Sequence, residues 1–250
     1  FEENDFDCVI HMAGEVGRMV GENRPNRMIY ANVSGSLNLI QLCLKYSVKL
    51  AFLSTSEVYG DLGEVTISED LEESSFKPTN VYALSKLFAE QLIMHYSKNY
   101  GLDAIRIRPF MVYGPGEYPG HFRSAMANFV SKALRGEKII VHRGAIRSWT
   151  FVDDFIIGVY KACTNGNFKT CEPYNIGRDD PRRMEDIAQI VIQNTHQNED
   201  LLEIVDPPDK FMSLVKKASF EKAREKLSFE ANISVEDGVC RTIDWQKKFN

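Results

Sequence analysis

The sequence predicts an α/β fold, a Rossmann-like doubly wound parallel sheet followed by a smaller α/β domain. Short apolar segments at 7–12, 49–54 and 103–109 have the character of buried strands. Longer segments with helical periodicity, 25–46 and 80–100, lie between them. Strands that alternate with helices in this way form βαβ units, and these units build a parallel sheet.

The two long helices are predicted from their periodicity and their ends. Within 25–46, Leu37 and Ile40 recur on one face of a helix. The segment 80–100 begins at Asn80, a suitable N-cap, and a glycine follows its last residue. Both segments are therefore expected to be helices that cover the sheet.

The composition of the sequence changes after the third predicted strand. A loop rich in glycine and proline, residues 113–121, leaves the sheet. The elements expected beyond it are a helix at about 122–135, strands at 137–142 and 147–152, a helix at 153–162, a strand end at 173–177, and helices near 183–194, 219–227 and 234–249. We expect the sheet domain to comprise residues 1–110 with about 147–172, and the smaller domain to comprise about 111–146 with 173–250.

Composition narrows the classes of function. The 250 residues carry a net charge of −5 and 44% of them are hydrophobic, without a basic stripe or an apolar run of membrane-spanning length. We therefore expect neither a nucleic-acid partner nor a membrane partner. The five cysteines are scattered and form no CxxC pair, which indicates reduced thiols in the cytoplasm and no zinc site.

Tyr82 and Lys86 form the strongest chemical signal. Residues four apart on a helix share one face, so the ammonium can lie near the phenol. A nearby cation favours the phenolate, so we expect Lys86 to lower the pKa of Tyr82 from about 10 toward neutrality. Such a tyrosine could act as an acid or a base. By itself this spacing more often marks a surface pair on a helix.

A second polar cluster follows the strand at 49–54. Ser54, Thr55, Ser56 and Glu57 stand directly after it. Ligands of open α/β sheets bind beyond the carboxyl ends of the strands, where a hydroxyl and a carboxylate could contact a substrate. Taken alone, the cluster could equally be a polar strand end with a solvated Glu57. Together with the tyrosine–lysine pair it indicates an active site.

Six segments resemble, in order, the motifs of the extended short-chain dehydrogenase/reductase family. They are VIHMAG (9–14), ANVSGSLNL (31–39), LSTSEVYG (53–60), NVYALSK (80–86), RIRPFMVYGPG (106–116) and RSWTFVDD (147–154). The correspondence extends to about residue 240 and is most similar to the nucleotide-sugar epimerases and dehydratases. The resemblance implies an NAD-binding domain, with NADP also possible for the family, and a second domain that binds a nucleotide sugar.

The resemblance also implies roles for individual residues. The catalytic residues would be Thr55, Tyr82, Lys86 and, as an additional acid or base, Glu57. Cofactor contacts would come from Ala13, Gly14, Asn32, Ser54, Tyr82, Lys86, Pro109, Phe110 and Val112. Substrate contacts would come from Thr55, Ser56, Glu57, Met111 and Arg147, the last as a clamp on the pyrophosphate. No metal ligand is implied.

The sequence departs from the family pattern in three places. The glycine-rich phosphate loop would precede Phe1, so we expect the chain to be part of a longer protein. Met111 replaces the usual asparagine, which puts that residue's phosphate contact in doubt. Glu57 favours elimination chemistry, yet many 4,6-dehydratases have an aspartate where Ser56 stands.

The sequence is compatible with several functions. The implied reaction oxidises the sugar at C4 to a transient 4-keto intermediate, followed by elimination or epimerisation. The alternatives are a nucleotide-sugar decarboxylase, an NADPH-dependent reductase, a non-catalytic NAD-sensing or scaffold protein, and a structural interaction module. The family commonly forms homodimers through a four-helix bundle, and residues 33–46 and 81–100 are the matching helices.

Overall fold

A four-stranded parallel sheet forms the centre of the computed structural model, which describes residues 1, 5–120, 123–207 and 213–249. In spatial order its strands are β1 (Cys8–His11), β2 (Lys49–Leu53), β3 (Ala104–Pro109) and β8 (Pro173–Ile176). The carboxyl ends of these strands therefore point in one direction. The predicted Rossmann-like α/β fold with a parallel sheet is confirmed.

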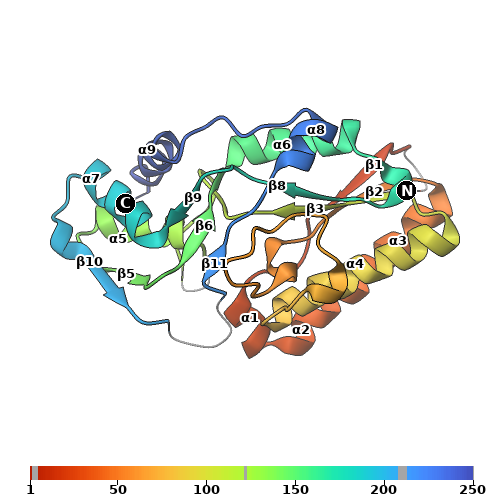
Figure 1. The fold of residues 1–250 in the computed structure, drawn as a ribbon, viewed down its shortest axis with the longest axis horizontal. Coiled ribbons are helices and arrows are strands. Elements are labelled where there is room, and N and C mark those ends of the chain that lie inside the picture. Colours follow the sequence, from red (N-terminus) through yellow and green to blue (C-terminus); the bar gives the residue numbers. More distant parts are fainter. Residues whose placement is uncertain (2–4, 121–122, 208–212, 250) are drawn as a thin grey trace.

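Helices cover both faces of this sheet (Figure 1). On one side lie α1 (Arg18–Asn23), α2 (Pro25–Ile29), η1 (Tyr30–Ser34), α3 (Gly35–Tyr46) and α4 (Val81–Tyr100), and on the other lie α6 (Val152–Asn165) and α8 (Glu221–Leu227). Successive side chains of β2 alternate between the two faces. Leu50 and Phe52 pack against α3 and α4, whereas Ala51 and Leu53 pack against Phe155 of α6. Both faces of β2 are thus apolar, as expected for a buried parallel strand.

The helix predicted over 25–46 is interrupted by a π-helical turn. Helix α2 leads into η1, and η1 leads into α3 without a loop. The hydrogen bonds of a π-turn span one more residue than those of an α-helix, and such turns occur often at functional sites. Asn32 lies within this turn with 1% of its surface exposed. The turn therefore coincides with a residue that the sequence assigns to the site.

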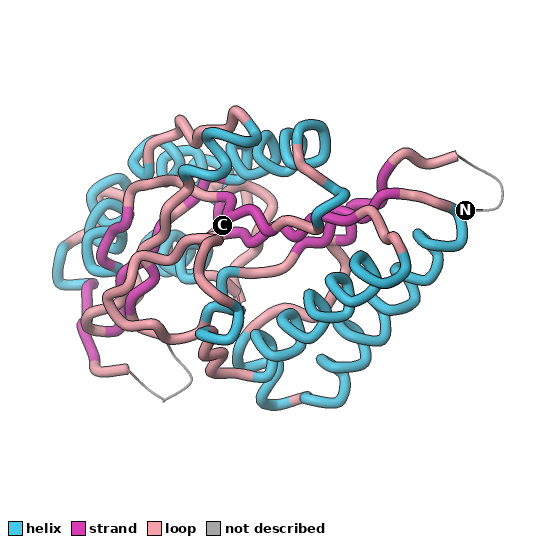
Figure 2. Tube along the Cα trace, turned by 45° about the vertical axis from the view of Figure 1, so that its right-hand side comes forward, coloured by secondary structure: helices cyan, strands magenta, loops and turns pink. Residues whose placement is uncertain are grey.

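The second region consists of short strands and helices (Figure 2). The strand pairs are β4 (Val112–Tyr113) with β7 (Thr150–Phe151), β5 (Ile139–His142) with β10 (Leu202–Val205), and β6 (Ile146–Ser148) with both β9 (Pro181–Arg183) and β11 (Val215–Lys216). The helices are α5 (Ala125–Leu134), α7 (Met184–Asn194) and α9 (Val235–Gln246). Across both regions, the described residues also form short 3₁₀ turns: η2 (Ser56–Tyr59), η3 (Glu73–Ser75), η4 (Phe168–Thr170) and η5 (Glu199–Leu201). Fully buried Trp149 packs with Val130, Ile187 and Val239 in a separate core. The last residue of the predicted loop, 121, and the first residue of the helix predicted at about 122–135 lie outside the described residues.

The expected domain boundary near residue 172 does not coincide with the strand pairing. Strand β8 pairs with β3 in the main sheet, with Tyr174 opposite Ile107. Helix α8 packs on the same face as α6, where Leu227 joins the core of that face. Residues 173–176 and 221–227 therefore lie with the sheet, although the sequence division placed them in the smaller domain. The periodicity of a strand does not reveal which sheet it joins.

All five cysteines are free thiols. Among the described residues, no helix has both the length and the apolar character that crossing a bilayer requires.

Candidate active site

The hydroxyl of Thr55 and the phenol of Tyr82 meet beyond the end of strand β2. Thr55 caps η2, with its Oγ1 accepting a hydrogen bond from the amide of Glu57 at 3.2 Å. Asn80 caps α4, which places Tyr82 in the first turn of that helix with 8% of its surface exposed. A side-chain hydrogen bond joins Thr55 and Tyr82. Two segments that are separate in sequence thus form one polar site.

The expected lowering of the pKa of Tyr82 by Lys86 is wrong for this structure. Burial raises the pKa of Tyr82 to about 12, the hydrogen bond from Thr55 opposes this rise, and the Glu57 carboxylate adds to it. The spacing of Tyr82 and Lys86 carries no information on desolvation, which disfavours a phenolate. Without a ligand, Tyr82 is therefore a neutral phenol at physiological pH.

Lys86 lies one helical turn beyond Tyr82 and is held at the end of strand β2. Its Nζ donates to the carbonyl oxygen of Leu53 at 2.7 Å and lies 4.7 Å from the centre of the Phe52 ring. Burial lowers the pKa of Lys86 to about 8, against the raising influence of Glu90. An ammonium has three donors, so the bond to Leu53 leaves capacity for the hydroxyls of a ligand.

Asn32 holds the segment that follows β1 against helix α4. Its amide oxygen accepts from the backbone of Glu15 at 2.8 Å, and its Nδ2 lies 2.9 Å from the hydroxyl of Ser85. The exposed residues Ala13 and Gly14 lie in this segment. A Cβ atom on Gly14 would lie 2.7 Å from the Asn32 oxygen and 3.8 Å from Nζ of Lys86.

These surroundings fit the nicotinamide ribose of NAD. Because Gly14 has no side chain, a ligand can approach its backbone closely. Lys86 supplies charged hydrogen-bond donors close to the same point. The backbone of Ser54, by contrast, donates to the carbonyl of Ile107 at 2.7 Å and so serves the sheet. Ala13, Gly14, Asn32 and Lys86 therefore form the part of the chain that would hold the cofactor.

The residues after strand β3 lie beside the site, but part of their backbone is already hydrogen-bonded within the protein. The amide of Phe110 donates to Ile176 at 3.1 Å, and its carbonyl accepts from the Thr150 hydroxyl at 2.8 Å. Pro109 ends β3 and Val112 begins β4. The backbone of Phe110, expected to contact the nicotinamide, is thus already bonded within the protein.

Met111 has a left-handed backbone conformation, with a φ angle of 30°. Residues other than glycine and asparagine adopt positive φ at a cost. The family usually has asparagine at this position, which tolerates the conformation. Met111 lines a cleft that Glu57 and Arg147 also line, so a strained residue stands at the edge of the site.

Partly exposed Glu57 forms an ion pair with buried Lys216, a residue that carries no signal in the sequence. Lys216 donates to Oε1 of Glu57, and Asn80 donates to Oε2 at 3.4 Å. Burial by itself would raise the pKa of Glu57, but the charge and hydrogen bond of Lys216, followed by the charge of Arg147, hold the pKa below its usual value. Glu57 is therefore a carboxylate at physiological pH. Ser56 is buried next to it in η2.

Backbone carbonyl oxygens fix the orientation of the Arg147 side chain. Its guanidinium donates to the carbonyls of Ile146, Leu214 and Ser213 at 2.8, 2.5 and 2.5 Å. It also lines a cleft of about 810 Å³ between the sheet and the second region. Among the described residues that line the cleft, five are lysines or arginines and one is a carboxylate: Arg18, Arg123, Lys132, Arg135 and Arg147, with Glu57. This charge balance suits an anionic ligand such as a diphosphate.

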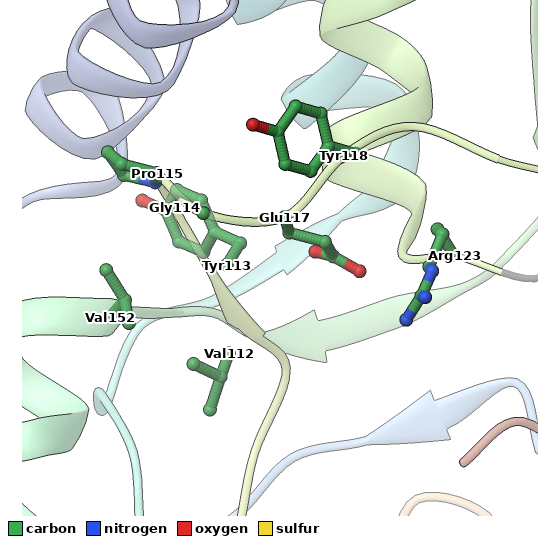
Figure 3. A pocket seen from close by; sticks show the side chains of 9 residues that line it. Val112, Tyr113, Gly114, Pro115, Glu117, Tyr118, Arg123 and Val152 are labelled. Carbon is green, nitrogen blue, oxygen red and sulfur yellow. The ribbon is translucent and has the colours of Figure 1, made fainter. Parts of the chain in front are cut away.

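A smaller cavity of about 390 Å³ borders the cleft (Figure 3). Val112 and Arg123 both line it, and Glu117 extends its carboxylate toward the side where Arg123 lies. Glu117 accepts from the amide and the hydroxyl of Ser124, the N-cap of α5, at 3.0 and 2.5 Å. This carboxylate therefore stabilises the start of a helix.

Comparison with known proteins places the chain in a family. Residues 1–177 match the profile of the NAD dependent epimerase/dehydratase family. The chain belongs to this family. The resemblance stated from the sequence motifs is therefore confirmed, and the two-segment site of Thr55 and Tyr82 lies within the matched residues.

Members of the NAD-dependent epimerase/dehydratase family similar to this chain have different activities. UDP-N-acetyl-alpha-D-glucosaminuronate decarboxylase of Bacillus cytotoxicus is 30% identical over 254 residues, covering 97% of this chain and 77% of the relative. UDP-glucuronate 4-epimerase of Thermodesulfobacterium geofontis is 30% identical over 254 residues, covering 99% and 75%. The crystal structure of dTDP-glucose 4,6-dehydratase from Bacillus anthracis in complex with NAD has a TM-score of 0.86 at 26% identity, covering 99% of this chain and 74% of that chain.

Proposed function

We propose that this chain acts, with NAD, on a nucleotide sugar, which it oxidises transiently at C4 before epimerisation or elimination. The observation that carries the proposal is the hydrogen bond between Thr55 and Tyr82, one helical turn from Lys86. The cationic cleft beside this site supports a nucleoside diphosphate as the anionic part of the substrate. The named activities of the relatives support the same class of reaction.

The chemistry of the first step belongs to Tyr82 and Thr55. Tyr82 takes the proton of the sugar's 4-hydroxyl, and Thr55 donates a hydrogen bond to the same oxygen. NAD, which Ala13, Gly14, Asn32 and Lys86 would hold, would supply a reversible hydride acceptor with a positively charged ring. Positive charge near the phenol lowers its pKa from the value of about 12 that burial imposes.

Glu57 would serve the second step. The 4-keto group acidifies the C5 proton, and Glu57 is an ionised carboxylate at the cleft that can accept it. Proton loss from C5 leads to elimination of the C6 hydroxyl or to inversion at C5. The 30% identity to a decarboxylase keeps loss of carbon dioxide as a second outcome for a uronic-acid substrate.

A panel experiment tests this function. The purified enzyme is incubated with NAD and, separately, with UDP-glucose, UDP-glucuronate, UDP-N-acetylglucosaminuronate and dTDP-glucose. Mass spectrometry and NMR then distinguish loss of water, loss of carbon dioxide and unchanged mass with altered stereochemistry. We expect turnover without net consumption of NAD and a drop of about 10²- to 10⁴-fold in Tyr82→Phe. Stoichiometric use of NADPH would instead indicate a reductase, and a folded protein that binds NAD without turnover would indicate a sensor.

We also propose a homodimer through helices α3 and α4. Leu84 and Phe88 lie one turn apart on α4 and are 50% and 55% exposed. An identical partner helix would cover such an apolar pair, as in four-helix packing. Light scattering should give twice the chain mass for the native protein and the single mass for Phe88→Glu. A native protein that is monomeric at high concentration contradicts the proposal.

A further inference from the structure

Lys216 and Arg147 occupy neighbouring positions on paired strands in the second region. Strand β11 runs parallel to β6, with Lys216 opposite Arg147. Like charges on adjacent strands repel each other, and the side chain of Lys216 is only 2% exposed. The carboxylate of Glu57 contacts Lys216 directly and attracts Arg147, so one anion stabilises two cations.

This ion pair is costly as a purely structural device. Burying two charges requires the loss of their hydration, and apolar residues of similar size often stabilise a protein as well or better. Lys216 is fully buried behind Glu57, whereas 28% of the Glu57 side chain is exposed. The ammonium is therefore placed to act on Glu57 and not to touch a ligand in the cleft.

The two oxygens of Glu57 have separate donors. Lys216 from β11 binds Oε1, and Asn80 from the start of α4 binds Oε2. Asn80 also caps the helix that carries Tyr82, so the orientation of the carboxylate is fixed relative to the phenol. Removal of Lys216 would free one oxygen and leave the partly buried carboxylate of Glu57 without its main counter-ion.

We propose that Lys216 is a positioning residue that keeps Glu57 ionised and oriented toward the cleft, so that Glu57 works as a base. In the proton-abstraction step, the C5–H bond of the 4-keto sugar breaks and an O–H bond forms on Glu57. The electron pair of the broken bond enters the 4-keto group and gives an enolate. This role deepens the proposed function and depends on it. The lowered pKa of Glu57 agrees with the same geometry.

Other charged groups face this pair and define what a titration would report. Arg147 on β6 and Tyr82 on α4 both interact with Glu57. Asp61, in the loop after η2, interacts with Lys216 and with Arg147, and Arg18 on α1 interacts with Arg147. All four are retained in a Lys216 variant, so a change in the titration of Glu57 is attributable to Lys216.

Carbon-13 NMR of protein labelled at the glutamate carboxyl measures this titration without any substrate. The Glu57 signal is assigned by its absence in Glu57→Gln, and its pKa is then measured in the native protein and in Lys216→Met, Lys216→Gln and Lys216→Arg. We expect a rise of about 1–3 pH units in Lys216→Met and Lys216→Gln, and restoration in Lys216→Arg. Lys217→Met is the matched control, because Lys217 pairs with the exposed Glu64 and should leave Glu57 unchanged.

Activity on the substrate found in the panel gives the second readout. The acid limb of the pH profile of kcat should move upward in Lys216→Met by the same interval as the NMR titration, with KM changed less than kcat. An unchanged Glu57 titration in folded Lys216→Met and Lys216→Gln overturns the role of Lys216, whatever the activity. A shifted titration in a protein that turns over no nucleotide sugar overturns the proposed function and the catalytic part of the role, and leaves only the control of ionisation.

Discussion

Nζ of Lys86 donates a hydrogen bond to the carbonyl oxygen of Leu53 at 2.7 Å, where strand β2 ends. The bond ties the helix that carries Tyr82 to the strand that leads to Thr55. It also places a cation in an apolar setting, against the ring of Phe52. This position of the ammonium suits a ligand that needs a charged donor. The burial of the charge lowers the free energy of unfolding by an amount that can be measured.

The first prediction concerns the pH dependence of stability. Burial lowers the pKa of Lys86 in the folded state to about 8 from 10.5. Between these pH values the unfolded chain binds more protons than the folded chain, so the free energy of unfolding rises with pH. We expect the contribution of Lys86 to this rise to reach about 3 kcal/mol. Urea denaturation across this range should show the increment in the native protein and not in Lys86→Met; parallel profiles would contradict it.

Thr55→Val should impair turnover without unfolding the protein. The substitution keeps the shape of the side chain but removes the hydroxyl that bonds Tyr82 and caps η2. A hydrogen bond to a charged group contributes about 1.5–3 kcal/mol, so kcat should fall about 10- to 100-fold. Thr55→Ser retains the hydroxyl and should keep most of the activity. Equal losses in the two variants would show that the hydroxyl is not the active group.

Met111→Asn should stabilise the protein. The φ angle of 30° suits asparagine better than methionine, and relief of the strain should raise the free energy of unfolding by about 1 kcal/mol. Met111→Leu keeps the unfavourable backbone conformation and is the control. Chemical denaturation of the three proteins checks this, and a less stable Met111→Asn would argue against backbone strain as the dominant effect.

Asn32→Ala should loosen the segment that contains Gly14. The change leaves the amide of Glu15 without its acceptor, at a cost of about 1–3 kcal/mol for a buried donor. Hydrogen exchange should report faster exchange at Glu15. Asn38→Ala, at an exposed position on α3, is the matched control and should leave this amide unchanged. Protection of Glu15 that survives in Asn32→Ala would mean that another group holds the segment.

The pairing of Thr55 with Tyr82 was within reach of the sequence because both residues follow strong local signals. Thr55 comes directly after a buried strand, and Tyr82 begins a capped helix. Carboxyl ends of parallel strands and the helices that follow them share one edge of the sheet, so the two had to be near each other. The predicted lowering of the pKa of Tyr82 was wrong because spacing along a helix carries no information on burial.

Lys216 could not be found in the same way. It lies on a strand of two residues, too short for any periodic pattern, and its partners Glu57 and Arg147 are distant in the chain. Only the pairing of β11 with β6 brings it to the site. The sheet membership of β8 escaped prediction for the same reason, since a strand of only four residues can join any open edge.

The chain leaves the main sheet after β3 and returns to it only with β8. During synthesis on the ribosome, β3 therefore emerges many residues before the strand that covers its outer edge. That edge stays open until a long loop has closed, and closure of long loops slows folding. We expect the nascent chain to be most exposed to misassociation in this interval, before residues 173–176 have left the exit tunnel.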